Sequence, residues 1–173
     1  MDVFEAIRTR LTVREFLPDA VPDEVLDRIV EAARLAPSSR NLQPWHFVVV
    51  TDSATLSQIG AIASSGRFVG TAPAAVAVAM DGADRPDLDA GRAIQQMELM
   101  AWSEGLGTCF VGLRDETQNA EIKALLGIPA ESQLITVLPF GYRQRVTAGA
   151  KGRKNRKPLS EVAHRERFGE PYA

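Results

Sequence analysis

The sequence predicts a single domain that contains both α-helices and β-strands. With 173 residues, the chain has the length of one domain and can bury a sizeable core. Short apolar segments rich in β-branched or small residues alternate along it with segments of helical periodicity. We expect strands at 46–50, 72–80, 108–113 and 133–140, and helices at 2–9, 22–35, 53–63, 88–104, 119–126 and 158–168.

The helix expected at 22–35 has the clearest pattern in the chain. Pro22 suits a first helical turn, and the acidic residues Asp23 and Glu24 favour the positive end of the helix dipole. Apolar residues then recur at helical spacing until the Ala36–Pro37 step, where the helix must end. In the helix expected at 2–9, Asp2 is available as an N-cap.

The strands are predicted from residue composition and from the positions of prolines. Residues 46–50 (HFVVV) are apolar and β-branched, and residues 72–80 (APAAVAVAM) are small enough for a helix to pack closely on them. The segment 133–140 (QLITVLPF) contains Pro139, which predicts a sheet edge or a strand end. Between the first two strands, residues 64–70 are expected to form a loop that carries Arg67.

The helix expected at 88–104 is apolar nearly all round. A helix with this pattern is buried on several sides, and in a chain of this size it indicates a subunit interface as much as a monomer core. We therefore expect a homodimer.

Composition excludes several classes of partner. The formal net charge is −2, so neither nucleic acid nor a membrane surface is an expected partner, and a small molecule is favoured. With a single cysteine, Cys109, and two distant histidines, His46 and His164, we expect no disulfide and no metal site. The N-terminus, MDVFEAIRTR, has no apolar signal segment, which predicts a cytoplasmic protein.

A charged extended segment follows the first helix. Arg10, Thr12 and Arg14 alternate there with apolar residues, so their side chains are expected to project from one face. Two guanidiniums flanking a hydroxyl form a suitable phosphate clamp. The alternative is an ordinary solvated strand.

The loop 36–45, APSSRNLQPW, is polar and carries two prolines. Pro37 and Pro44 fix their own φ angles and restrict the residues before them, which predicts a rigid loop able to position a ligand. The alternative is a plain helix-to-strand connection.

The segment 141–157 is basic and contains no acidic residue. Runs of this kind are usually solvated or bind nucleic acid. A third interpretation is that Lys154 and Arg156 meet Arg10 and Arg14 on one anion.

Four stretches in order resemble the nitroreductase family of flavin enzymes: IRTRLTVREF, APSSRNLQPWHFVVV, GLGTCFVG and RKNRKPLSEV. The resemblance covers nearly the whole chain, and the second stretch is the most specific. It implies an α+β fold, with a helix-flanked mixed, mainly antiparallel sheet in an intertwined homodimer. Residues 1–173 would form one FMN-binding domain, with 141–173 as a C-terminal arm.

The same resemblance implies one FMN in each of two clefts at the dimer interface. The residues implied to contact it are Arg10, Leu11, Thr12, Arg14, Pro37, Ser38, Ser39, Asn41, Arg67, Val111, Gly112, Lys154 and Arg156. Those of the 37–41 loop would reach the cofactor of the partner subunit. The chain departs from some relatives in lacking an acidic residue at Val111 and in lacking inserted helices over the active site.

The implied function is electron transfer from NADH or NADPH to an electron-poor acceptor, such as a nitroaromatic or a quinone, in a ping-pong cycle. No GxGxxG motif is present, which fits a nicotinamide that visits and leaves. No side chain is assigned as a general acid. The alternatives are another flavin reaction on the same fold, such as dehalogenation, dehydrogenation or flavin fragmentation, and a non-catalytic flavin-binding protein.

Overall fold

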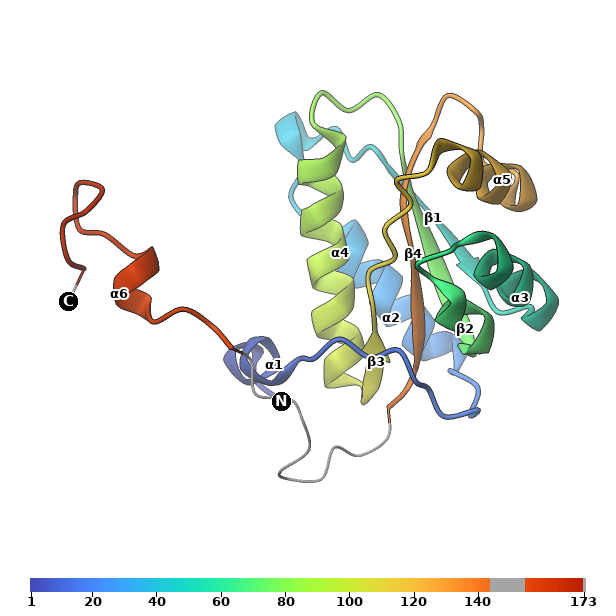
Figure 1. The fold of residues 1–173 in the computed structure, drawn as a ribbon, viewed down its shortest axis with the longest axis horizontal. Helices are drawn as coiled ribbons and strands as arrows, with labels where there is room; N and C mark the ends of the chain where they lie inside the picture. The colour runs from blue at the N-terminus through green and yellow to red at the C-terminus, as the bar shows by residue number, and fades with distance from the viewer. Residues whose placement is uncertain (144–154, 173) are drawn as a thin grey trace.

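The computed structural model describes residues 1–143 and 155–172 (Figure 1). Its elements, in chain order, are α1 (Val3–Thr9), α2 (Asp23–Arg34), η1 (Ser39–Asn41), β1 (Trp45–Val50), α3 (Ser53–Ile62), η2 (Arg67–Thr71), β2 (Ala74–Met80), α4 (Pro86–Ser103), β3 (Leu106–Thr108), α5 (Glu116–Leu126), β4 (Gln133–Tyr142) and α6 (Leu159–Val162). Here η marks a 3₁₀-helix.

The described strands form one sheet in the order β1-β2-β4-β3, and every neighbouring pair is antiparallel. The parallel contribution is a single bridge between Thr12 and Thr108 at the β3 edge. Together with the flanking helices, this sheet confirms the expected α+β class.

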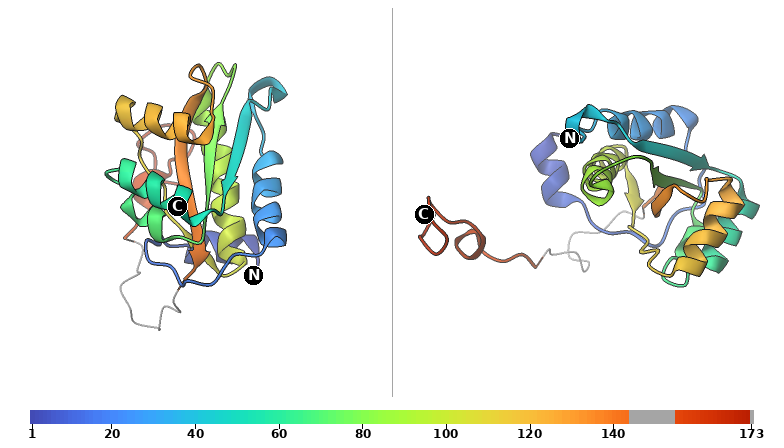
Figure 2. Two further views of the ribbon diagram at one scale, coloured as in Figure 1. Left: turned by 90° about the vertical axis from the view of Figure 1, so that its right-hand side faces the viewer. Right: turned by 90° about the horizontal axis from the view of Figure 1, so that it is seen from above.

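Helices cover both faces of the sheet (Figure 2). Apolar side chains of α2 and α4 pack with alternate residues of β2 and β4 into one core, which includes Ile29, Met97 and Phe140. Residues of α3, η2 and α5 pack on the other face, where Ile59 and Ile122 are fully buried. The alanines of β2 leave room for this close packing from both sides, as the sequence predicts.

The third strand is shorter than expected and lies earlier in the chain. It spans Leu106–Thr108 rather than 108–113, and the following residues have no regular structure. In the register of β3 with β4, the next pair would be Cys109 with Pro139, and Pro139 has no N–H to donate. The prediction that Pro139 marks an edge or a strand end is also wrong, because β4 is an inner strand that continues to Tyr142.

Two further expectations need correction. The predicted loop at 64–70 contains the 3₁₀-helix η2, which packs so closely on α3 that a Cβ on Gly60 would lie 2.6 Å from the backbone nitrogen of Gly70. The predicted helix at 158–168 is confined to α6, because its apolar residues Leu159 and Val162 remain exposed and no packing extends it.

The C-terminal segment 155–172 lies apart from the rest of the described chain (Figures 1 and 2). Its large apolar side chains are exposed, with Phe168 at 94%. No helix among the described residues is long and apolar enough to cross a membrane.

Candidate functional site

The segment 10–17 crosses the β3 edge of the sheet and is held there by its backbone. The N–H of Val13 donates to the Thr108 carbonyl at 2.9 Å, and the N–H of Leu17 donates to the Tyr142 carbonyl at 2.8 Å. The Val13 side chain fills the space over Gly107, where a glycine Cβ would lie 2.5 Å from it. This packing turns the apolar residues inward and leaves Thr12 and Arg14 exposed, as the alternation predicts, with Leu11 partly buried.

Cys109 lies near the positive charges of Arg10 and Arg14. Burial raises the pKa of the Cys109 thiol, the charges of the two arginines oppose that rise, and the charge of Glu98 adds to it. Arg10 also forms an ion pair with Glu98 of α4 at 3.6 Å. Because Glu98 is buried, its pKa is raised by desolvation, against the opposing charge of Arg10.

The raised pKa of Glu98 predicts a pH-dependent stability. Between the ordinary range of a glutamate and the raised value, the folded state binds more protons than the unfolded state, so wild-type stability falls as pH rises. Glu98→Gln cannot titrate. We expect the free energy of unfolding of this variant, relative to wild type, to increase with pH across that interval in urea titrations. A difference that is flat or decreases with pH would contradict this assignment.

Arg14 also connects to the η2 region. Its guanidinium carbon lies 5.8 Å from the centre of the Phe68 ring, the range of a cation–π contact. Arg67, the neighbour of Phe68, is exposed. The residues just before η2 contact the chain after β3, since the Ser65 hydroxyl donates to the Gly112 carbonyl at 2.9 Å.

In the segment 111–113, which follows β3, an exposed glycine lies between two residues whose side chains are buried. Val111 and Leu113 are buried, whereas Gly112 is exposed and a Cβ there would meet nothing within 4 Å. Among the described residues, the structure records no acceptor for the Gly112 N–H. We call the six residues gathered here the arginine wall: Arg10, Thr12, Arg14, Arg67, Val111 and Gly112.

The predicted polar loop adopts a strained backbone. Arg40, Asn41 and Gln43 have φ angles of 52°, 56° and 51°, a region that residues other than glycine rarely occupy. The Ser38 hydroxyl accepts a hydrogen bond from the Gln43 N–H at 2.9 Å, which closes the turn. We call Pro37–Asn41 the serine loop.

Asp89 anchors the serine loop to α4. Its fully buried carboxylate accepts hydrogen bonds from the Ser39 N–H at 3.0 Å and from the Ser39 hydroxyl at 3.2 Å, and Arg92 lies 3.1 Å from it. Sequence reasoning missed Asp89. No local signal marks it, because Asp87 and Asp89 both stand in the first turn of the helix and only the fold shows which of them is buried.

Removal of this anchor should destabilise the fold. Asp89→Ala leaves the partly buried donors of Ser39 without their acceptor, which costs about 1–3 kcal/mol of unfolding free energy. Urea denaturation measures the loss. The control is Asp87→Ala, since Asp87 lies in the same helical turn but is exposed, and its removal should change stability by less than about 0.5 kcal/mol. Equal effects of the two substitutions would contradict the anchoring role.

Within one chain, the serine loop and the arginine wall lie apart. Asp89 contacts the loop and Glu98 contacts Arg10, and nine residues of the same helix separate these anchors, a rise of about 13.5 Å. Of the two basic residues expected from the C-terminus, Arg156 is exposed in the segment 155–172, and Lys154 lies outside the described residues.

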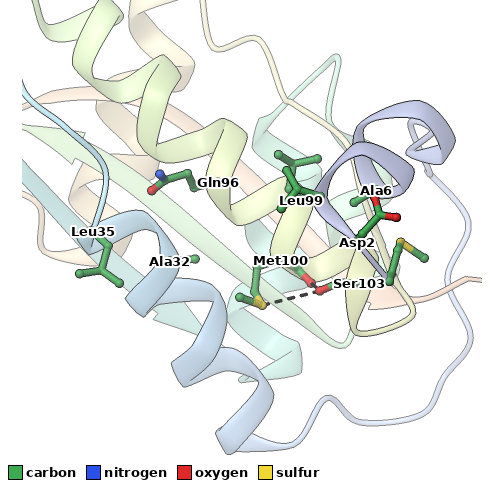
Figure 3. A pocket seen from close by; sticks show the side chains of 10 residues that line it. Asp2, Ala6, Ala32, Leu35, Gln96, Leu99, Met100 and Ser103 are labelled. Atoms are coloured by element: carbon green, nitrogen blue, oxygen red, sulfur yellow. Dashed lines mark hydrogen bonds between the residues drawn. The ribbon is translucent and has the colours of Figure 1, made fainter.

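A groove of about 510 Å³ lies between α1, α2 and α4 (Figure 3). Ala32, Leu35, Leu99 and Met100 contribute apolar side chains to it. The side-chain oxygen of Gln96 is buried beside the groove and has no hydrogen-bond partner among the described residues. In the part of the chain that the structure describes, no cluster of three or more potential metal-ligating residues of the His, Cys, Asp and Glu types occurs.

Comparison with known proteins gives consistent matches. The model of the nitroreductase family matches residues 7–82 and 63–142. A protein of Methanothermobacter thermautotrophicus named "Putative NADH dehydrogenase/NAD(P)H nitroreductase" is 36% identical over 148 residues, which is 82% of this chain and 78% of that protein. An iodotyrosine deiodinase of Haliscomenobacter hydrossis is 40% identical over 67 residues, 39% of this chain and 30% of that protein.

A solved structure adds a match to the fold. It is an FMN-dependent nitroreductase of Clostridium difficile R20291, with a TM-score of 0.82 and 27% sequence identity. The match covers 95% of this chain and 99% of that one.

Proposed function

Because this chain belongs to the nitroreductase family, we propose that it is an FMN-dependent oxidoreductase that transfers electrons from NADH or NADPH to an electron-poor small molecule. The observation that carries the proposal is the arginine wall. Two guanidiniums and a hydroxyl lie there on the segment that crosses the β3 edge, and the exposed Gly112 lies on the chain that follows β3. This donor set matches a ligand with a phosphate at one end and a polar ring at the other.

The residues of the arginine wall fit FMN. Arg10, Thr12 and Arg14 would bind the phosphate, since guanidinium and hydroxyl donors suit its oxygens. The Gly112 N–H would donate to the ring, with Arg67 at a polar edge of it. When bound, FMN supplies the redox chemistry, taking electrons from the nicotinamide and passing them to an acceptor.

A second copy of the chain would complete the site. The serine loop lies about 13.5 Å along α4 from the contact with Arg10, so a single copy does not carry it to the arginine wall. The groove between α1, α2 and α4 is apolar, and Val3 and Phe4 of α1 are more than two-thirds exposed. A homodimer would bury these surfaces, and the partner's copies of Ser38, Ser39 and Asn41 would reach the flavin.

The C-terminal arm would close the phosphate end of the cleft. Lys154 and Arg156 add positive charge near the start of a segment whose apolar side chains, Leu159 and Val162, are exposed. In the proposed dimer these apolar side chains would pack on the partner subunit, and the basic pair would meet the phosphate.

A second candidate is reductive dehalogenation on the same site. The similarity to an iodotyrosine deiodinase over 67 residues favours it. A shared FMN site does not separate the two reactions, because they differ in the acceptor. The acceptor must therefore be found by experiment.

Steady-state kinetics test the proposal. We expect turnover of a quinone or a nitroaromatic at the expense of NADH or NADPH, with parallel double-reciprocal lines because the nicotinamide leaves before the acceptor binds. Turnover of only a halogenated tyrosine analogue would favour the second candidate. Bound FMN that neither nicotinamide reduces would favour a non-catalytic binding protein.

A further inference from the structure

The backbone of residues 111–113 lies beyond the end of β3 and is held by side chains. The carbonyl of Val111 accepts from the Thr136 hydroxyl at 2.9 Å, and that of Gly112 accepts from Ser65 at 2.9 Å. The carbonyl of Leu113 accepts from the Asn119 amide at 3.4 Å. Three different segments thus bind three consecutive carbonyls, which fixes where the exposed Gly112 lies.

The ladder of β3 with β4 ends because of one residue of β4. The Thr108 carbonyl accepts from Val13, so Thr108 turns its backbone away from β4, and the alternation of a strand turns Cys109 toward it. The residue of β4 that would face Cys109 in this register is Pro139, which cannot donate. The chain after Thr108 therefore needs a different partner.

Thr136 supplies that partner from the same strand. Its hydroxyl accepts from the Val111 N–H at 3.2 Å and donates to the Val111 carbonyl, so one side chain binds both backbone groups of one residue. The register between β2 and β4 shifts beside it, since Val78 pairs with Thr136 and Ala79 pairs with Leu134. A bulge of this kind redirects side chains out of the ordinary alternation.

We propose that Thr136 is a positioning residue for the flavin ring, because it sets the height of Val111 and Gly112 above the sheet. This inference rests on the proposed function, in which the Gly112 backbone faces the cofactor. Thr136 is completely buried, so it acts through Val111 and does not touch the ligand. A valine of the same shape would keep the packing and lose both hydrogen bonds.

Two variants and one control test the inference. Thr136→Val should weaken FMN binding about tenfold, the scale of one or two lost hydrogen bonds, and should shift the absorbance spectrum of the bound flavin. Thr136→Ser, which keeps the hydroxyl, should restore both. In FMN-free protein, amide exchange at Val111 should accelerate in the valine variant and stay slow in the serine variant.

Val50→Ala is the matched control for stability alone. Val50 is buried at the end of β1, on the opposite edge of the sheet, and its truncation should lower the melting temperature without changing FMN affinity. Wild-type affinity and spectrum in Thr136→Val would overturn the inference, as would equal FMN loss in Val50→Ala. Wild-type protein that binds no FMN would overturn the proposed function, and this inference with it.

Discussion

Arg14→Ala should weaken FMN binding by about 10- to 150-fold while the fold persists. A charge-assisted hydrogen bond contributes about 1.5–3 kcal/mol, and each 1.4 kcal/mol corresponds to about a tenfold change in affinity. The Arg14 side chain is exposed, and its guanidinium lies over the Phe68 ring and near Cys109. Its loss therefore removes hydrogen-bond donors without opening the core. Fluorescence titration with FMN measures the affinity, and circular dichroism checks the fold.

Arg14 gives a cleaner test of phosphate binding than Arg10. Arg10 pairs with the buried Glu98, so Arg10→Ala leaves a carboxylate without its countercharge and should reduce stability as well as affinity. Arg34→Ala is the matched control, since Arg34 forms an exposed pair with Glu31 on α2 and should leave FMN binding unchanged. Wild-type affinity in Arg14→Ala would show that this residue does not bind the phosphate.

Leu99→Arg should convert the protein to a monomer and remove its FMN. Leu99 lines the groove between α1, α2 and α4 (Figure 3), and a charged side chain there would be buried without a partner in the proposed dimer. A monomer would lack the partner's serine loop, so the flavin should dissociate along with the subunits. Sedimentation velocity, recorded at both the protein and the flavin absorbance, measures the loss of the dimer and the loss of bound FMN in one experiment.

The control for this variant is Val49→Arg. Val49 is 43% exposed on the edge strand β1, away from the groove, so the same charge there should leave assembly and FMN content unchanged. A Leu99→Arg monomer that retains FMN would contradict the shared site. A wild-type monomer that carries FMN would contradict it as well.

The sequence predicts the elements of this fold because most of them follow from local patterns. The stripe of α2 and the small residues of β2 each specify one element and its burial, and both elements occur as expected. The predicted end of the third strand is wrong because the strand ends where it meets Pro139 of β4, about thirty residues further along the chain. A local apolar run does not show which residue will face it across a sheet.

The candidate site divides in the same way. Arg10, Thr12 and Arg14 can be proposed from the sequence because alternation in an extended segment is a local property. Asp89 and Thr136 cannot, since each acts on a residue distant in sequence through a hydrogen bond of its buried side chain. In sequence, Asp89 is one more acid near a helix start, and Thr136 is one more β-branched strand residue.

Anaerobic titration of the FMN-loaded protein with NADH and with NADPH tests the central claim most directly. If the chain is a flavin-dependent oxidoreductase, one equivalent of at least one nicotinamide should abolish the absorbance band of the oxidised flavin, and addition of a quinone should restore it. A protein that binds no FMN, or whose bound FMN keeps its absorbance with both nicotinamides, would contradict the account.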